Sequence, residues 1–282
     1  MSSAAAVPSL VEVGHGDPRD SVYEWMLAKK WPLSLISFVV VLTVWELAGT
    51  TGVLPDYILS PLEIVRGVAT AHDEGLLIPA LVTSGRRLLA GFAIGTGCGI
   101  VLGLLSGRSW LVGKLVDPLV SVANPLPKIA LLPVFAVWLG FTDVTRVSVI
   151  ALGCFFPAYI NSASGTRLVE KNLVRVAENA EASRLRRFFG VVLPAALPRV
   201  LVGTRIALAL SFVTLFAGEI VVSPDGVGGM LYNGYQNGRY DVMYGGLLVL
   251  ALAGFLADLL LGWVGVRLTR GQAIEAVGHD GR

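Results

Sequence analysis

Two stretches of this chain run for 20 residues each without a charged side chain, at residues 88–107 and 147–166. A helix needs about 20 apolar residues to cross the roughly 30 Å of hydrocarbon in a bilayer. The composition agrees, because 54% of the 282 residues are hydrophobic and only 15% are charged, against about 25% in soluble domains. Both stretches are therefore predicted to be transmembrane helices.

Four further apolar spans cover residues 32–50, 115–139, 201–222 and 242–266. A soluble helix would show a polar face at every turn, and these segments do not. We expect an all-α membrane protein with six transmembrane helices, in a membrane domain of residues 29–270 between polar tails at 1–28 and 271–282. The four spans carry ionisable residues inside or near their ends: Glu46, Asp117, Lys128, Arg205, Glu219 and Asp258.

The distribution of Lys and Arg indicates how these helices are oriented. With the N-terminus inside, 15 of the 22 basic residues fall in cytoplasmic segments and three fall in outer segments. Basic residues accumulate on the cytoplasmic side of membrane proteins. The pattern therefore predicts that both termini are cytoplasmic.

One internal connection, residues 175–198, is long, basic and rich in alanine, and it closes on Leu193-Pro194. Packed helices are usually joined by about two to eight residues, so this segment is predicted to dock a cytoplasmic partner. The alternative is a solvated basic loop that lies on anionic lipid. Seven basic residues lie in or beside it: Arg167, Lys171, Arg175, Arg184, Arg186, Arg187 and Arg199.

Glycine recurs every fourth residue through the first uncharged stretch. A step of four keeps Gly91, Gly95, Gly99 and Gly103 on one slowly drifting helix face, and Gly107 completes the series. Such a face lets another helix approach at backbone distance. The similar-looking dinucleotide fingerprint requires a soluble strand–turn–helix context, so we predict helix packing.

The third span is irregular because prolines stand at positions 118, 125, 127 and 133. Proline breaks or kinks a helix, and broken backbone at membrane depth is tolerated where it lines a cavity or is buried in protein. One interpretation places Asn124 and Lys128 on the substrate pathway, with Lys128 facing an anion or a carboxylate. The other places Lys128 near the interface, where its ammonium reaches water.

Glu219, near the end of the fifth span, is the third candidate for the pathway. It either pairs with Lys128 or Arg205 or caps its helix at the interface. The turn-rich residues 223–229 that follow suit either a contact with an external partner or an ordinary reverse turn.

Other residue types exclude other functions. Cys98 and Cys154 lie in uncharged spans without a second ligand at a useful spacing, so neither a disulfide nor a metal site is expected. The basic residues are divided among loops, which argues against nucleic-acid binding. The sequence contains no Walker-type nucleotide-binding motif and no catalytic triad, so we expect no enzymatic activity. Arg86 and Arg87 are expected to be interfacial anchors.

Three segments carry a family resemblance: GFAIGTGCGIVLGLLSG at 91–107, NPLPKIALLPVFAVWLG at 124–140 and LPAALP at 193–198. With the basic connection, they resemble the membrane permease subunits of binding-protein-dependent ABC importers, in the nitrate/sulfonate/taurine-type branch. The resemblance extends from about residue 31 to residue 270. It implies the type I importer permease fold, in which a cytoplasmic coupling helix lies between transmembrane helices 4 and 5.

The resemblance also implies partners. A pair of cytoplasmic ATPase subunits would hold ATP and Mg²⁺, and this chain would bind no cofactor. A second permease copy would complete a homodimer in the bacterial cytoplasmic (inner) membrane. A periplasmic or extracellular binding protein would deliver a small anion, such as a sulfonate, taurine or nitrate, over residues 51–79 and 223–241. The alternative is an ion-coupled secondary transporter, although the carboxylates map toward span ends.

The coupling motif of the family falls on this sequence with one clear departure. Where the family has a glycine, in a turn that favours positive φ, this chain has Glu181. A Glu held in left-handed geometry would cost on the order of 1 kcal/mol, so either the turn is built differently or Glu181 makes a new charge contact with the partner. The resemblance assigns ATPase coupling to Arg175, Ala177, Glu181, Ala182, Ser183, Arg184, Leu193 and Pro194.

Overall fold

The computed structural model describes residues 30–222 and 225–269, and every regular element in these two ranges is helical. The predicted tails, 1–28 and 271–282, lie outside the described residues. In chain order the elements are α2 (Lys30–Thr50), α3 (Pro61–Asp73), α4 (Leu77–Arg108), α5 (Trp110–Ala123), η1 (Lys128–Leu131), α6 (Leu132–Leu139), α7 (Asp143–Arg167), α8 (Lys171–Asn179), α9 (Arg184–Arg187), η2 (Phe188–Val192), α10 (Leu193–Val222), α11 (Gly226–Gln236) and α12 (Tyr240–Leu268). Of these, η1 is a 3₁₀ turn and η2 is a π turn.

The expected all-α architecture with six spans is confirmed. Within the described ranges, α2, α4, α7, α12 and the helical run that ends with α10 are long and apolar enough to cross a membrane. The sixth span is the pair formed by α5 and the following η1–α6 segment, which is bent by 89°. Two helices are longer than their uncharged stretches, since α4 begins at Leu77 and α7 at Asp143. Charged side chains therefore lie inside both.

The chain divides into two compact units, one that ends at Leu62 and one that begins at Glu63. In the first unit, the carboxylate of Glu46 accepts hydrogen bonds from the Ser60 hydroxyl at 3.2 Å and from the Leu62 amide at 3.0 Å. Glu46 near the end of α2 is therefore partnered, as a carboxylate in a membrane helix needs to be.

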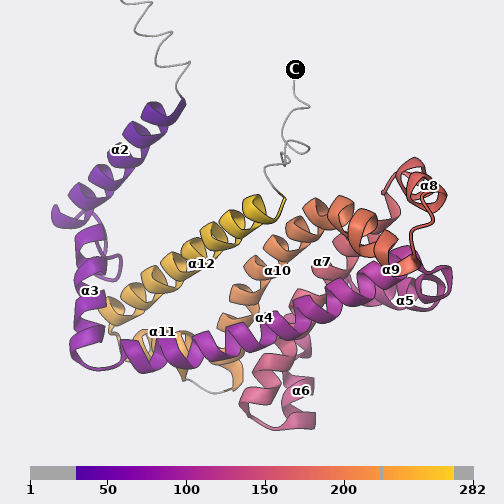
Figure 1. The fold of residues 1–282 in the computed structure, drawn as a ribbon. Coiled ribbons are helices and arrows are strands. Elements are labelled where there is room, and N and C mark those ends of the chain that lie inside the picture. Colours follow the sequence, from indigo (N-terminus) through magenta and orange to yellow (C-terminus); the bar gives the residue numbers. More distant parts are fainter. Residues whose placement is uncertain (1–29, 223–224, 270–282) are drawn as a thin grey trace, which may run out of the picture. The chain divides into compact units, whose positions relative to one another are not determined.

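In the second unit, α7 packs against both α4 and α10 (Figure 1). The glycine face of α4 lies against α7 so closely that an added Cβ has no room. For Gly99 the nearest atom, the Phe155 carbonyl oxygen, would lie 2.6 Å from that Cβ. We call this contact the glycine seam, and its pairs are Gly91 with Ile150, Gly95 with Ala151, Gly99 with Phe155 and Gly103 with Tyr159.

The proline-rich third span consists of two helices at a sharp angle. Pro118 lies inside α5, and Pro133 stands in the first turn of α6, where the missing amide hydrogen is tolerated. Val120 of α5 packs with Phe156 and Tyr159 of α7. The bend therefore leaves α5 attached to the core while α6 takes a different direction.

The connection after α7 is shorter than the sequence suggested. A continuous helical run extends from Arg184 through η2 to Val222, so Leu193 and Pro194 begin α10 and do not close a loop. The helix therefore extends further toward the N-terminus than the apolar span expected at 201–222. A π turn directly before Pro194 widens the backbone, which accommodates a proline ring that would otherwise end the helix.

Gly95→Ala should destabilise the glycine seam, because the new methyl group would overlap the Ala151 carbonyl. We expect a loss of about 1–3 kcal/mol, measured as a lower midpoint of thermal unfolding in detergent. Gly97→Ala is the matched control, since nothing lies within 4 Å of its added Cβ. Equal midpoints for the two variants would show that the seam does not set the packing of α4 on α7.

Candidate functional site

The segment that the resemblance assigns to ATPase coupling lies at one end of the second unit (Figure 1). It consists of α8, residues 180–183 and α9, and we call it the coupling segment. Arg187 of α9 forms an ion pair with Glu178 of α8. The Ser183 hydroxyl caps α9 by accepting a hydrogen bond from the Arg186 amide at 3.3 Å. The two short helices are thus held together by their own side chains.

Glu181 ends α8 in the left-handed conformation, with φ of 53°. The Ala182 amide donates to the Ala177 carbonyl at 3.1 Å, and the Glu181 amide donates to the Glu178 carbonyl at 3.0 Å. This is the Schellman arrangement that usually ends a helix at glycine. The turn therefore keeps the geometry that suits the family glycine, and no other non-glycine residue of the described ranges has positive φ.

The coupling segment and the start of η2 after it present a mixed apolar and basic surface. Leu185 is 71% exposed, Val176 68% and Phe189 61%. Large apolar side chains gathered on a surface mark a site of contact with a protein, a membrane or a ligand. Sequence reasoning missed these three residues and selected their neighbours instead. Of those neighbours, Ala177 and Ala182 are half-buried, and the exposed ones are Arg175, Glu181, Ser183 and Arg184.

Leu193 and Pro194 stand apart from this surface. Leu193 is half-buried and packs in a cluster with Leu104 and Val200. Pro194 is exposed in the first turn of α10. Their contribution in the structure is to begin the long helix that follows the coupling segment.

Lys128 faces no carboxylate among the described residues. Its ammonium group donates a hydrogen bond to the Asn124 carbonyl and lies 4.6 Å from the centre of the Phe156 ring. A cation over an aromatic ring is stabilised where water is scarce. The pairing of Lys128 with Glu219 was therefore wrong, and Lys128 and Asn124 together bridge the break between α5 and α6.

Glu219 is buried against Arg87 of α4. The Glu219 side chain is 1% exposed and that of Arg87 is 3% exposed, and 3.1 Å separates Oε1 from Nη1. Glu219 also accepts hydrogen bonds from the Ser84 hydroxyl at 2.7 Å and from the Gly228 amide at 2.8 Å. The second donor lies in the first turn of α11, where the helix dipole favours an anion. Both carboxylate oxygens are therefore satisfied, as a buried ion pair requires.

Two other carboxylates, those of Asp143 and Asp225, are exposed and connect Arg87 to a second buried arginine, Arg146. Asp225 lies 2.8 Å from Arg87 and 2.9 Å from Arg146, and Asp143 lies 2.6 Å and 2.8 Å from the same two groups. Burial opposes ionisation of Asp225, but the two guanidinium groups outweigh it and hold the pKa of Asp225 below its usual range. With Glu219, these residues form what we call the Arg87 cluster.

The Arg87 cluster corrects two expectations. Arg87 is buried and is not an interfacial anchor, whereas Arg86 is exposed, because adjacent residues point about 100° apart around a helix. Residues 226–229 are not a loop but the buried first turn of α11. Gly226 has φ of 77°, and an added Cβ would overlap the Glu219 carboxylate, so this position requires glycine.

Two further ion pairs lie within the spans. Asp117 lies 2.6 Å from Arg167, and Arg205 lies 2.5 Å from Asp258. Arg205 is thus the partner of Asp258, and its suggested pairing with Glu219 was wrong. In the part of the chain that the structure describes, no group of three or more His, Cys, Asp or Glu residues is arranged to hold a metal ion.

Arg87→Gln should be strongly destabilising, because it leaves the buried Glu219 carboxylate without its counter-ion. We expect a loss of about 3–5 kcal/mol, measured by denaturant unfolding in detergent. Arg86→Gln, one residue away and exposed, should change stability by about 0.5 kcal/mol or less. Similar losses in both variants would contradict the central place given to Arg87.

Glu181→Gly should stabilise the turn between α8 and α9 by about 1 kcal/mol, because glycine adopts positive φ without strain. The expected result is slower hydrogen exchange of the Ala182 amide. Ala180→Gly is the control, since Ala180 has φ of −81° and glycine there should only loosen the chain. Faster exchange in Glu181→Gly would mean that the Glu181 side chain itself holds the turn.

The fold and these sites define a class of protein, the helical membrane proteins that cross a bilayer several times. Residues 99–270 match the family described as "Binding-protein-dependent transport system inner membrane component". The chain belongs to this family.

Curated relatives of this family are similar over most of their length. The putative aliphatic sulfonates transport permease protein SsuC of Bacillus subtilis (strain 168) is 33% identical, over 81% of this chain and 83% of the relative. The taurine transport system permease protein TauC of Escherichia coli (strain K12) is 30% identical, over 88% and 92%. The nitrate import permease protein NrtB of Leptolyngbya laminosa is 28% identical, over 83% and 86%.

A solved structure of an ABC transporter shares the fold. The chain is similar to a chain of the inward-facing MetNI methionine ABC transporter, with a TM-score of 0.50 and 20% identity over 74% of this chain and 95% of that chain. Together with the family match, this similarity confirms the expected importer permease fold.

Proposed function

We propose that this chain forms the translocation pathway of an ATP-driven importer for a small anion and hydrolyses no ATP itself. The observation that carries the proposal is the family membership, together with relatives named for sulfonates, taurine and nitrate. The three solutes share an anionic group, and this common chemistry is what we assign to the substrate. A separate ATPase subunit supplies the energy and holds ATP and Mg²⁺.

The coupling segment is the proposed contact with that ATPase. Leu185, Val176 and Phe189 are exposed next to several arginines, a combination that suits an apolar cleft with an acidic rim. The ion pair between Arg187 and Glu178 makes α8 and α9 move together. A displacement of the segment is therefore passed directly into α10, with which α9 is continuous.

The orientation of the chain follows from this contact. The coupling segment faces the cytoplasm, and the Arg87 cluster, at the opposite end of α10, faces outward. The external binding protein docks on that outer end, where α11 and the beginning of α12 lie, and both termini are cytoplasmic. Because ATPase subunits act in pairs and this chain has one coupling segment, the transporter contains two permease copies, proposed to be identical.

An ion-coupled secondary transporter is disfavoured by the carboxylates of the spans. Such a carrier needs a carboxylate that binds and releases an ion near the middle of the membrane. Glu46, Asp117, Glu219 and Asp258 each already have a partner in the structure. The relatives reported above are named as permeases of transport systems for organic and inorganic anions, which favours the importer.

The proposed docking surface is tested by co-purification. Leu185→Asp should abolish co-elution of a P-loop ATPase with this chain from mild detergent, because it places a charge in an apolar contact. The side chain is already exposed, so the fold of the chain should be unaffected. Gln236→Asp, at the other end of the second unit and exposed, should leave co-elution intact. Unchanged co-elution in Leu185→Asp would contradict the docking model.

A further inference from the structure

Arg205 and Asp258 form a charged pair within the membrane-spanning part of α10 and α12. Arg205 lies about 21 Å along the axis of α10 from Glu219, at a rise of about 1.5 Å per residue. Its guanidinium donates from Nε to Oδ1 of Asp258 at 2.9 Å and from Nη2 to Oδ2 at 2.5 Å. Charged groups within membrane-spanning helices are costly, and they usually mark a functional site.

This pair is open to its surroundings, unlike the ion pair of Arg87 with Glu219. The Arg205 side chain is 48% exposed and that of Asp258 is 44% exposed, whereas Arg87 and Glu219 are almost fully buried. An ion pair half open to lipid would be strongly unfavourable. The face of the second unit that carries the pair therefore borders water or a polar surface.

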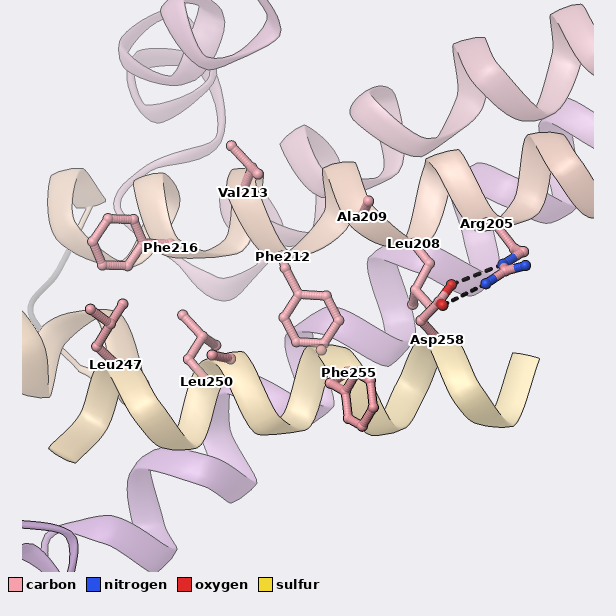
Figure 2. A pocket seen from close by; sticks show the side chains of 12 residues that line it. Arg205, Leu208, Ala209, Phe212, Val213, Phe216, Leu247, Leu250, Phe255 and Asp258 are labelled. Atoms are coloured by element: carbon pink, nitrogen blue, oxygen red, sulfur yellow. Dashed lines mark hydrogen bonds and ion pairs between the residues drawn. The ribbon is translucent and has the colours of Figure 1, made fainter. Parts of the chain in front are cut away.

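The pair closes one end of a groove between α10 and α12 (Figure 2). The groove has a volume of about 470 Å³, which is within the range of sites for small molecules. Beyond the pair its walls are mostly apolar: Phe212 reaches from α10 toward α12, and Phe255 of α12 is among the lining residues. A molecule with one charged end and an apolar body fits this distribution.

The hydrogen bonds to Asp258 occupy only one edge of the Arg205 guanidinium. They use Nε and Nη2, and no described residue accepts a hydrogen bond from Nη1. A guanidinium carries N–H donors on more than one edge of a planar fork. The other edge can therefore bind an anion while Asp258 holds the plane of the group.

We propose that an organic anion with a sulfonate or carboxylate group binds in this groove as it crosses the membrane. Arg205 is its ligand, Asp258 is a positioning residue, and the apolar walls contact the body of the molecule. The inference rests on the proposed transport function. Because Asp258 already neutralises Arg205, the anion is held weakly, which suits a site that must also release it.

The test uses the complete transporter in lipid nanodiscs, without ATP. Cys98→Ala removes the exposed native thiol, and Ala209→Cys places a reporter in the groove, one helical turn from Arg205. The reporter is labelled with two small thiosulfonate reagents, one carrying a sulfonate and the other a quaternary ammonium. We expect the sulfonate reagent to react faster, and butanesulfonate to slow its reaction more than methanesulfonate does.

Arg205→Gln should reduce this advantage of the sulfonate reagent by about tenfold, because a charge-assisted hydrogen bond is lost. Arg205→Lys keeps the charge and should retain most of the advantage. The inference is overturned if Arg205→Gln leaves the advantage unchanged. The reporter is also treated with a neutral maleimide. If only the maleimide reacts, lipid or another helix fills the groove and the inference is overturned. It is likewise overturned if Arg205→Lys separates the two permease copies, because Arg205 would then hold the copies together.

Uptake of butanesulfonate by the parent complex in proteoliposomes is measured in parallel. ATP-dependent uptake combined with labelling that is insensitive to Arg205 would overturn only the groove site. Absence of ATP-dependent uptake of any anion tested would overturn the proposed function, whatever the labelling shows.

Discussion

The buried charge of Arg87 is the constraint on which the arrangement of the second unit depends. A guanidinium inside an apolar helix has to be neutralised by its neighbours, and the partners of Arg87 come from α7, α10 and the residue before α11. Pairing the single charge of Arg87 therefore holds α4, α7, α10 and the start of α11 together at one end of the unit. The glycine seam extends the same order along α4, because it holds α4 and α7 at backbone distance toward the opposite end.

The two ends of the second unit differ in physical character. At one end Arg87 and Glu219 are buried and paired. At the other end the coupling segment is short, exposes Leu185 and Val176, and stores strain at Glu181. A continuous helical run from Arg184 to Val222 connects the two ends. Under the proposed function, this helical run transmits a movement at the ATPase to the outer end of the unit. Arg205 lies in the run, between the coupling segment and Glu219.

Much of this fold could be predicted from the sequence, and the unpredicted parts share a cause. Uncharged length predicted the spans, glycine spacing indicated a close helix contact, and prolines indicated the broken third span. Arg87 was missed because nothing local distinguishes it from Arg86, and only the packed fold shows which of the two is buried. The partner of Glu219 was missed for the same reason, since Arg87 lies in a distant helix. The extension of this helix before residue 201 was not predicted, because Leu193-Pro194 resembles a helix break unless the preceding π turn is known.

The central claim is that this chain moves its solute by coupling to ATP hydrolysis, and uptake by the reconstituted complex tests it most directly. The permease, its ATPase and its binding protein are placed in proteoliposomes, and uptake of a radiolabelled sulfonate is followed with and without ATP inside. The account predicts uptake that requires ATP and continues after ionophores collapse all ion gradients. Uptake that needs no ATP and stops when the gradients are collapsed would contradict it.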